Sequence, residues 1–187
     1  MKKVFLFATL VYACTFSSYA QPAPPPAPEP ADNILKAALK EAKKENKKVF
    51  IMFHASWCIW CHKMDSSMND ATCKDFFEKN FVIRHLVVDE SKDKKDLENP
   101  GANELRTKYY GDGQGIPFWL VFDKDGKLLS DSKIHKEGEI PEGGQNVGCP
   151  ANEEEVTFFI NLLKKSTNLS AEDEARIRTR FRRNDVH

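Results

Sequence analysis

The sequence predicts an α/β fold, with a mixed central sheet flanked by helices and an extra helix at the C-terminus. Short apolar runs indicate buried strands, and amphipathic segments with helical periodicity stand between them. The apolar runs are residues 49–54, 81–88 and 118–122. A tight turn then precedes a last strand, and this alternation with a terminal hairpin is typical of a mixed sheet covered by helices.

The expected elements follow in chain order. Asp32 or Asn33 is expected to cap a first helix that ends near Asn46, and a second helix should begin near Cys58 or Ile59. Asp70 is expected to cap a continuation of that second helix. Further expected elements are a helix over 102–110, a strand over 128–134 paired with the strand 118–122, and a helix over 153–165. The charged run 90–98 should be a solvated loop, and 135–150 a glycine-rich excursion.

Charge and composition exclude one class of partner. The 28 Lys and Arg residues balance 28 Asp and Glu residues, so the formal net charge is zero. Without an excess of positive charge the chain lacks the footprint of a nucleic-acid-binding protein, and no nucleic-acid partner is expected. A hydrophobic content of 41% with 13 Phe indicates a packed core rather than a disordered chain.

Residues 1–20 have the pattern of a signal peptide. Lys2 and Lys3 precede an apolar run that is too short to span a membrane, and Ser18 and Ala20 supply small residues for cleavage. The alternative is lipoprotein processing at Cys14, which would place a lipid anchor there. Both routes export the protein, and the bacterial character of the leader favours the periplasm.

The ends of the mature chain are expected to lie outside a domain over residues 32–167. Residues 21–31 hold six of the ten prolines and are expected to form an extended linker. Residues 168–187 are expected to form a basic helix or tail, capped by Ser170 and docked on the domain. Its arginines offer contact with anionic lipid or a partner as the alternative; they are Arg176, Arg178, Arg180, Arg182 and Arg183.

The segment Trp57-Cys58-Ile59-Trp60-Cys61 carries the chemistry. It follows a buried strand, so a helix that starts there puts Cys58 at its N-terminus, where free backbone N–H groups and the helix dipole stabilise a thiolate. A thiolate is the nucleophile of thiol–disulfide exchange. Cys61 lies one turn further on the same face and can attack a mixed disulfide on Cys58.

Three other interpretations of the cysteine pair remain open. With His62 the pair also matches the attachment motif of c-type haem, and Met64 and Met68 offer axial ligands. Zinc would need a fourth ligand beside the two cysteines and His62. A purely structural disulfide is the third alternative. The position of the pair between a strand and a helix favours redox exchange over all three.

Gly115-Ile116-Pro117-Phe118 is the second informative segment. A proline directly before an apolar strand can be trans and simply begin an edge, or cis and serve a specific purpose. A cis Pro117 packed against the cysteine pair would keep a metal away. It would also leave the backbone of Ile116 free to pair with an extended substrate.

On these two segments the chain resembles the thioredoxin superfamily, and the stretch MNDATCKDFFEKNFV is more similar to its periplasmic members than to cytosolic thioredoxin. VFIMFHASWCIWC is similar to the central strand and active-site turn of that family, and GIPFWLVFDKDGKLL to its proline loop and closing hairpin. The resemblance spans some 130 residues. It implies a thioredoxin-like fold in which Cys58 attacks, Cys61 resolves and Pro117 is cis, with Trp57 and Ile116 supporting the substrate.

The chain departs from the family pattern at two places. Met52 stands where thioredoxins carry a buried Asp that moves the proton of the resolving thiol. His54, His62 and His85 are candidates to replace it, and His62 beside Cys61 is the best of them. The dipeptide Ile59-Trp60 lacks the His of strongly oxidising relatives, which favours a reductase.

The expected function is therefore that of an exported protein-disulfide reductase acting through Cys58 and Cys61. Its partners would be protein thiols and disulfides and a membrane-bound or soluble thiol donor; neither cofactor nor metal is expected. The alternative is a thioredoxin-fold binding module without redox turnover, because Met52 is apolar and Ile59-Trp60 is bulky. Cys73 and Cys149 are expected to be separate buried thiols.

Overall fold

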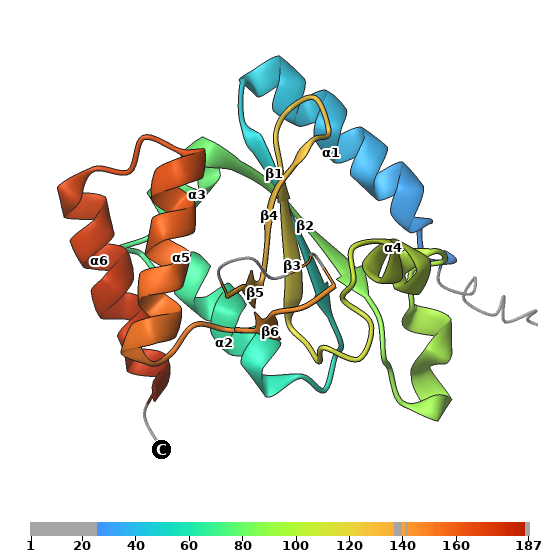
Figure 1. Cartoon of the computed structure of the whole chain (residues 1–187). Coiled ribbons are helices and arrows are strands. Elements are labelled where there is room, and N and C mark those ends of the chain that lie inside the picture. The colour runs from blue at the N-terminus through green and yellow to red at the C-terminus, as the bar shows by residue number, and fades with distance from the viewer. Residues whose placement is uncertain (1–25, 137–139, 141, 186–187) are drawn as a thin grey trace, which may run out of the picture.

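A computed structural model describes residues 26–136, 140 and 142–185 of the chain. The expected leader 1–20 and residues 21–25 of the expected linker lie outside these residues. A four-stranded sheet with the order β2-β1-β3-β4 forms the centre of the fold (Figure 1). The strands are β1 (Lys48–His54), β2 (Phe81–Val87), β3 (Phe118–Phe122) and β4 (Leu128–Asp131). β1 runs parallel to β2 and antiparallel to β3, so the predicted mixed sheet is confirmed.

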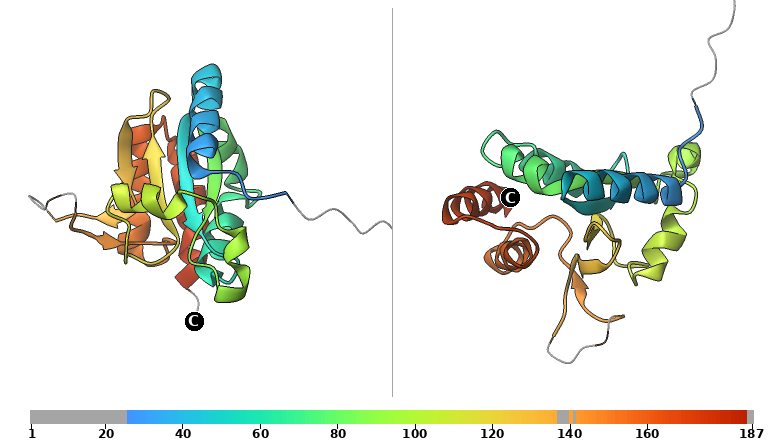
Figure 2. Two further views of the ribbon diagram at one scale, coloured as in Figure 1. Left: turned by 90° about the vertical axis from the view of Figure 1, so that its right-hand side faces the viewer. Right: turned by 90° about the horizontal axis from the view of Figure 1, so that it is seen from above.

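Helices cover both faces of this sheet (Figures 1 and 2). On one side lie α1 (Ala31–Glu45) and α4 (Ala102–Lys108); on the other lie α2 (Ile59–Met68), α3 (Lys74–Asn80), α5 (Glu153–Ser166) and α6 (Ala171–Arg182). The strand β1 shows why. Its side chains alternate in direction, so Ile51 and Phe53 pack toward α1 while Phe50 and Met52 pack toward α2 and α5. A continuous apolar run is what a strand covered on both faces requires.

The prediction that Asp32 or Asn33 caps the first helix is wrong. α1 begins at Ala31, one residue into the expected linker, and neither Asp32 nor Asn33 caps it. Instead the N–H of Ala31 donates to the carbonyl oxygen of Pro100 at 2.8 Å, and Ala31 is fully buried. A distant backbone carbonyl thus satisfies the first N–H of the helix, and both residues expected as caps lie inside it.

The interruption after α2 is also longer than expected. α3 begins at Lys74, and Asp70 caps a turn rather than the helix, because its carboxylate accepts from the N–H and hydroxyl of Thr72. These bonds lower the pKa of Asp70 to about 2. Cys73 lies at the start of α3, and it and Cys149 are free and buried, as predicted.

Short elements form in both segments predicted as loops, 90–98 and 135–150, and one predicted strand is divided. The charged run includes a 3₁₀ helix (Lys92–Leu97) with no buried residue. The expected strand 128–134 is divided, because β4 ends at Asp131 and the next two residues form β5 (Lys133–Ile134). β5 pairs antiparallel with β6 (Gln145–Asn146) in a separate ribbon that projects from the body of the fold (Figure 2).

The additional C-terminal helix α6 belongs to the main core. Ser170 caps it as predicted, with its hydroxyl accepting from the N–H of Asp173. Ile177 and Phe181 are fully buried in the same cluster as Phe77 and Phe159. In the described part of the chain, no helix combines the length and the apolar character that crossing a bilayer requires.

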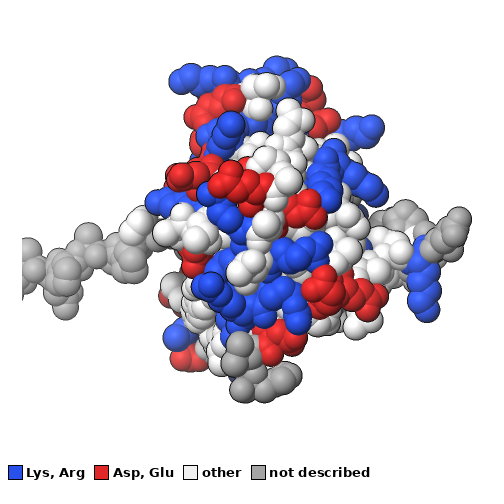
Figure 3. Space-filling model, turned by 90° about the vertical axis from the view of Figure 1, so that its left-hand side faces the viewer, with Lys and Arg blue, Asp and Glu red and all other residues white. Residues whose placement is uncertain are grey.

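Carboxylates surround the basic residues of α6. Arg180 pairs with Asp70, and Arg178 and Arg182 both pair with Glu153. Arg176 pairs with Asp173 in the first turn of the same helix. Positive and negative side chains are accordingly interspersed on this face of the molecule (Figure 3). These ion pairs attach α6 to α5 and to the turn between α2 and α3, and they leave less positive potential for an anionic surface than the sequence suggests.

Candidate active site

The two cysteines of the motif form a disulfide at the start of α2. Cys58 is the N-cap residue, and α2 begins at Ile59, as the sequence predicts. The Cα atoms of Cys58 and Cys61 are 5.2 Å apart. The backbone N–H of Cys61 points at Sγ of Cys58, at 3.1 Å. The same N–H would donate to the thiolate of Cys58 once the disulfide is reduced, together with the positive end of the helix dipole.

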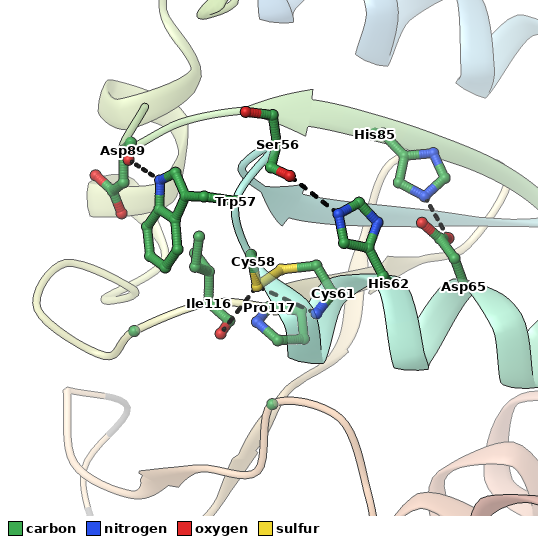
Figure 4. The surroundings of a disulfide bond; sticks show 12 residues. Ser56, Trp57, Cys58, Cys61, His62, Asp65, His85, Asp89, Ile116 and Pro117 are labelled. Atoms are coloured by element: carbon green, nitrogen blue, oxygen red, sulfur yellow. Dashed lines mark hydrogen bonds and ion pairs between the residues drawn. A yellow bond between two sulfur atoms is a disulfide. The ribbon is translucent and has the colours of Figure 1, made fainter. Parts of the chain in front are cut away.

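The two sulfurs differ in their surroundings. Cys61 is completely buried, whereas Cys58 keeps 3% of its surface exposed and is therefore the outer residue of the pair. Sγ of Cys58 lies 3.6 Å from the carbonyl oxygen of Ile116, and the Ile116–Pro117 peptide bond is cis. Ile116 and Pro117 thus face the disulfide from the loop before β3 (Figure 4).

The loop after β2 holds the turn that precedes Cys58. The indole Nε1 of Trp57 donates to the carbonyl oxygen of Asp89 at 2.8 Å. Both the N–H and the hydroxyl of Ser56 donate to the carboxylate of Glu90. Arg106, of which only 6% is exposed, forms a bidentate ion pair with Asp89. α4 therefore fixes the β2 loop, and that loop fixes the two residues before the cysteine.

Glu90 is a site residue that the sequence interpretation placed in a solvated loop. It is 4% exposed, and burial opposes its ionisation, but the hydrogen bonds from Ser56 outweigh burial and hold the pKa of its carboxyl below the usual value. A signal for it exists in the sequence. Because β1 and β2 are parallel, residues that follow their carboxyl ends meet at one edge of the sheet.

The three histidines named as proton carriers lie in two places. His85 on β2 makes a 2.8 Å contact with the carboxylate of Asp65, and its ring packs against that of His54, with centroids 5.1 Å apart. His62 is exposed, and its Nε2 lies 3.0 Å from the carbonyl oxygen of Ser56 (Figure 4). Met52, at the position of the family's buried Asp, is 1% exposed and packs in the core. No carboxylate replaces it on β1 itself.

The environment of His54 makes the stability of the fold depend on pH. Burial lowers the pKa of the half-buried His54, and the neighbouring His85 adds to the effect, with a smaller lowering from His62. The carboxylates of Asp65 and Glu90 act in the opposite direction but do not cancel it. The folded state therefore resists protonation of His54 more than the unfolded chain does.

We expect the free energy of unfolding to fall as the pH drops below about 6.5, the ordinary pKa of histidine. Below that value the unfolded chain binds a proton that the folded state accepts less readily, so stability is present above it and is lost with acidification. In His54→Gln this part of the loss should disappear, which urea unfolding at pH 7.5 and 5.5 would measure. His135→Gln, outside the cluster, is the control; equal pH dependence in wild type and His54→Gln would contradict the assignment.

Apolar side chains and a groove surround the disulfide. Trp57, Ile59 and Trp60 are 57%, 70% and 44% exposed, although each is large and apolar. A groove of about 320 Å³ lies beside the proline loop. Its lining includes Trp60, Ile116, Pro117, Val147, Gly148 and Asn152. The described residues contain no group of three or more His, Cys, Asp or Glu side chains placed to hold a metal ion.

A mixed sheet with a disulfide at the start of the helix after its central strand, opposite a cis proline, defines the class of thioredoxin-like folds. The sequence profile of the thioredoxin-like domain matches residues 35–134, more than half of the chain. The chain therefore belongs to the thioredoxin-like domain family, as its sequence motifs predict. No curated protein sequence is similar enough to this chain to count as a match.

Several solved structures are similar to the chain. A disulfide isomerase from Xylella fastidiosa Temecula1 is 22% identical, with a TM-score of 0.46, over 83% of this chain and 92% of that chain. DsbH oxidoreductase is 20% identical, with a TM-score of 0.41, over 80% and 93%. The C-terminal domain of DsbD from Neisseria meningitidis, in its oxidised form, is 25% identical, with a TM-score of 0.38, over 56% and 84%.

Proposed function

We propose that the protein is an exported thiol–disulfide oxidoreductase that reduces protein disulfides through Cys58 and Cys61. The observation that carries the proposal is the disulfide at the N-terminus of α2, with the N–H of Cys61 directed at Sγ of Cys58. A thiolate formed at that position has a hydrogen-bond donor and a helix dipole already in place, which is the requirement for a cysteine nucleophile.

In the proposed reaction the thiolate of Cys58 attacks one sulfur of a substrate disulfide. The substrate S–S bond breaks, a mixed disulfide forms on Cys58, and the other substrate sulfur leaves as a thiolate. Cys61 then loses its proton and attacks Sγ of Cys58. This step re-forms the Cys58–Cys61 disulfide and releases the second substrate thiolate. Two electrons have passed to the substrate, and a dithiol donor must reduce the protein for the next cycle.

The exposure of the two sulfurs supports this division of roles. Cys58 is the outer residue and Cys61 the fully buried one, so an incoming disulfide reaches Cys58 first. We assign Ile116, Pro117 and Trp57 to the support of the substrate, because they surround Cys58 in the oxidised state. His62 keeps the role of proton carrier for Cys61 as part of the proposal, supported by its exposed position directly after that residue.

A protein rather than a small molecule is the proposed substrate. Trp57, Ile59 and Trp60 expose large apolar surfaces around the redox pair, and such surfaces usually mark contacts with another protein. The direction of electron flow and the export of the protein rest on the sequence, namely on Ile59-Trp60 and on the pattern of residues 1–20. Processing at Cys14 with a lipid anchor remains the alternative to cleavage after Ala20.

The proposal predicts that reduced Cys61→Ser protein forms a stable mixed disulfide with a peptide disulfide such as insulin. Without the resolving thiol, the adduct on Cys58 cannot be released, and mass spectrometry would show it as the added mass of one insulin molecule. The free thiols should not compete, since burial raises the pKa of Cys149 to about 12 and also raises that of Cys73. The matched control is Cys58→Ser combined with Cys61→Ser, which should capture nothing. Capture by this control, or none by Cys61→Ser, would refute the mechanism.

A further inference from the structure

The ribbon formed by β5 and β6 lies beside the loop that carries the cis proline. Its last residue, Asn146, reaches this loop across 29 residues of sequence. The Nδ2 group of Asn146 donates to the carbonyl oxygens of Gln114 at 3.1 Å, Gly115 at 3.3 Å and Pro117 at 3.1 Å. One side chain thus contacts three backbone carbonyls within four residues of the loop.

The orientation of this amide follows from its fourth contact. Oδ1 of Asn146 accepts the backbone N–H of Gly148 at 3.1 Å, and only the oxygen end of an amide can accept. The NH₂ end must therefore face the carbonyls of the loop. All four contacts agree on one orientation.

The backbone that follows Asn146 is itself held in place. The N–H of Val147 donates to the carbonyl oxygen of Ser132 at 2.8 Å, and Nε1 of Trp119 donates to that of Gly148 at 2.9 Å. Trp119 is fully buried in the main core. Gly148 lies against Pro117. Its φ of +64° is a left-handed backbone conformation that glycine adopts without strain. The amide is thus attached through Gly148 and Trp119 to the sheet.

The contacts leave one residue of the loop facing the redox pair. Asn146 binds the carbonyls of Gly115 and Pro117, on either side of Ile116, whereas the carbonyl of Ile116 lies 3.6 Å from Sγ of Cys58. The side chain therefore holds the loop through the carbonyls on either side of Ile116. Its loss would allow the backbone of Ile116 to move relative to the sulfur without removing any group that reacts.

We infer that Asn146 is a positioning residue for thiol–disulfide exchange: its amide holds the loop 114–117 so that Ile116 can pair with the backbone of a peptide substrate at Cys58. This inference rests on the proposed function. The amide contacts the loop and not the reacting sulfurs. Its loss should therefore lower the rate of reduction of substrates that pair with the loop, and leave unchanged the rate for substrates that contact only the sulfurs.

The test compares two disulfides with reduced protein. Insulin presents peptide backbone next to its disulfide, whereas 5,5′-dithiobis(2-nitrobenzoate) has none. For Asn146→Ala we expect kcat/KM with insulin to fall about tenfold, mainly through KM, as the loss of one or two net hydrogen bonds implies. Asn146→Asp, which keeps the size but brings a carboxylate toward three carbonyl oxygens, should lose at least as much. The rate with the aromatic disulfide should stay within about twofold of wild type.

Asn161→Asp is the matched control, since Asn161 is exposed on α5 and the change is chemically the same. It should leave both rates unchanged. Wild-type activity of both Asn146 variants on insulin would overturn the inference, and so would an equal loss on both substrates, which indicates a general structural role. If the wild-type protein reduces neither disulfide, the proposed function itself fails, and the two failures are thereby distinguished.

Discussion

Replacing Cys58 with serine is expected to lower the rate of insulin reduction by at least about 10³-fold, because a serine hydroxyl does not ionise near neutral pH and cannot form the mixed disulfide. The effect should be large since the N-terminus of α2 and the N–H of Cys61 act on the sulfur of Cys58. The measurement is the dithiothreitol-driven reduction of insulin, followed as the precipitation of its chains.

Cys73→Ala is the matched control for this experiment. It removes a buried thiol at the start of α3, outside the candidate site, and should keep wild-type activity. Near-normal activity of Cys58→Ser would contradict the assignment of the nucleophile. A folded wild-type protein that does not reduce insulin at all would instead favour the alternative of a binding module, for which the apolar Met52 and the bulky Ile59-Trp60 are the sequence arguments.

Replacing Phe181 with alanine should lower the free energy of unfolding by about 3–5 kcal/mol, the usual cost of removing a fully buried aromatic side chain. Phe181 is 0% exposed, and its ring centroid lies 5.0 Å from that of Phe159 and 6.3 Å from that of Phe77. The cavity would therefore open between α3, α5 and α6. Urea unfolding of the two proteins measures the difference.

The control for Phe181→Ala is Leu97→Ala, which truncates an apolar side chain that is 45% exposed on the 3₁₀ helix. Its effect should stay within about 0.5–1 kcal/mol. A similarly small effect of Phe181→Ala would mean that α6 is an independent tail. A large effect would mean that the thioredoxin-like domain of this chain is incomplete without its C-terminal helix.

Much of the architecture was predictable because it depends on neighbours in sequence. The alternation of apolar runs with helical periodicity identified β1, β2 and β3 to within one residue at each end. Ser170 was recognised as a cap because its partner, Asp173, is three residues away. The start of α2 at Ile59 follows from the same kind of local pattern, and with it the place of Cys58 at the N-terminus of the helix.

The errors concern groups whose partners are far away along the chain. Asp32 and Asn33 appeared suited to cap α1, but the helix begins before them, at Ala31, whose N–H donates to the carbonyl oxygen of Pro100. Glu90 belongs to a charged run typical of a loop, yet Ser56, 34 residues earlier, draws its carboxylate into the site. The arginines of α6 offered a basic surface only as the alternative to a docked helix, and Asp70 and Glu153, far away along the chain, pair with Arg180 and Arg178.

Local patterns in the chain therefore identified the family, the order of the elements and the two cysteines that meet at the start of α2, since periodicity, caps and motif spacing act over a few residues. Folding brought together what no local pattern could: Glu90 with Ser56, His54 with His85, and Asn146 with the loop of Pro117. The physical reason is that burial and hydrogen bonding depend on which segments become neighbours in space, and the packing of the whole chain determines that.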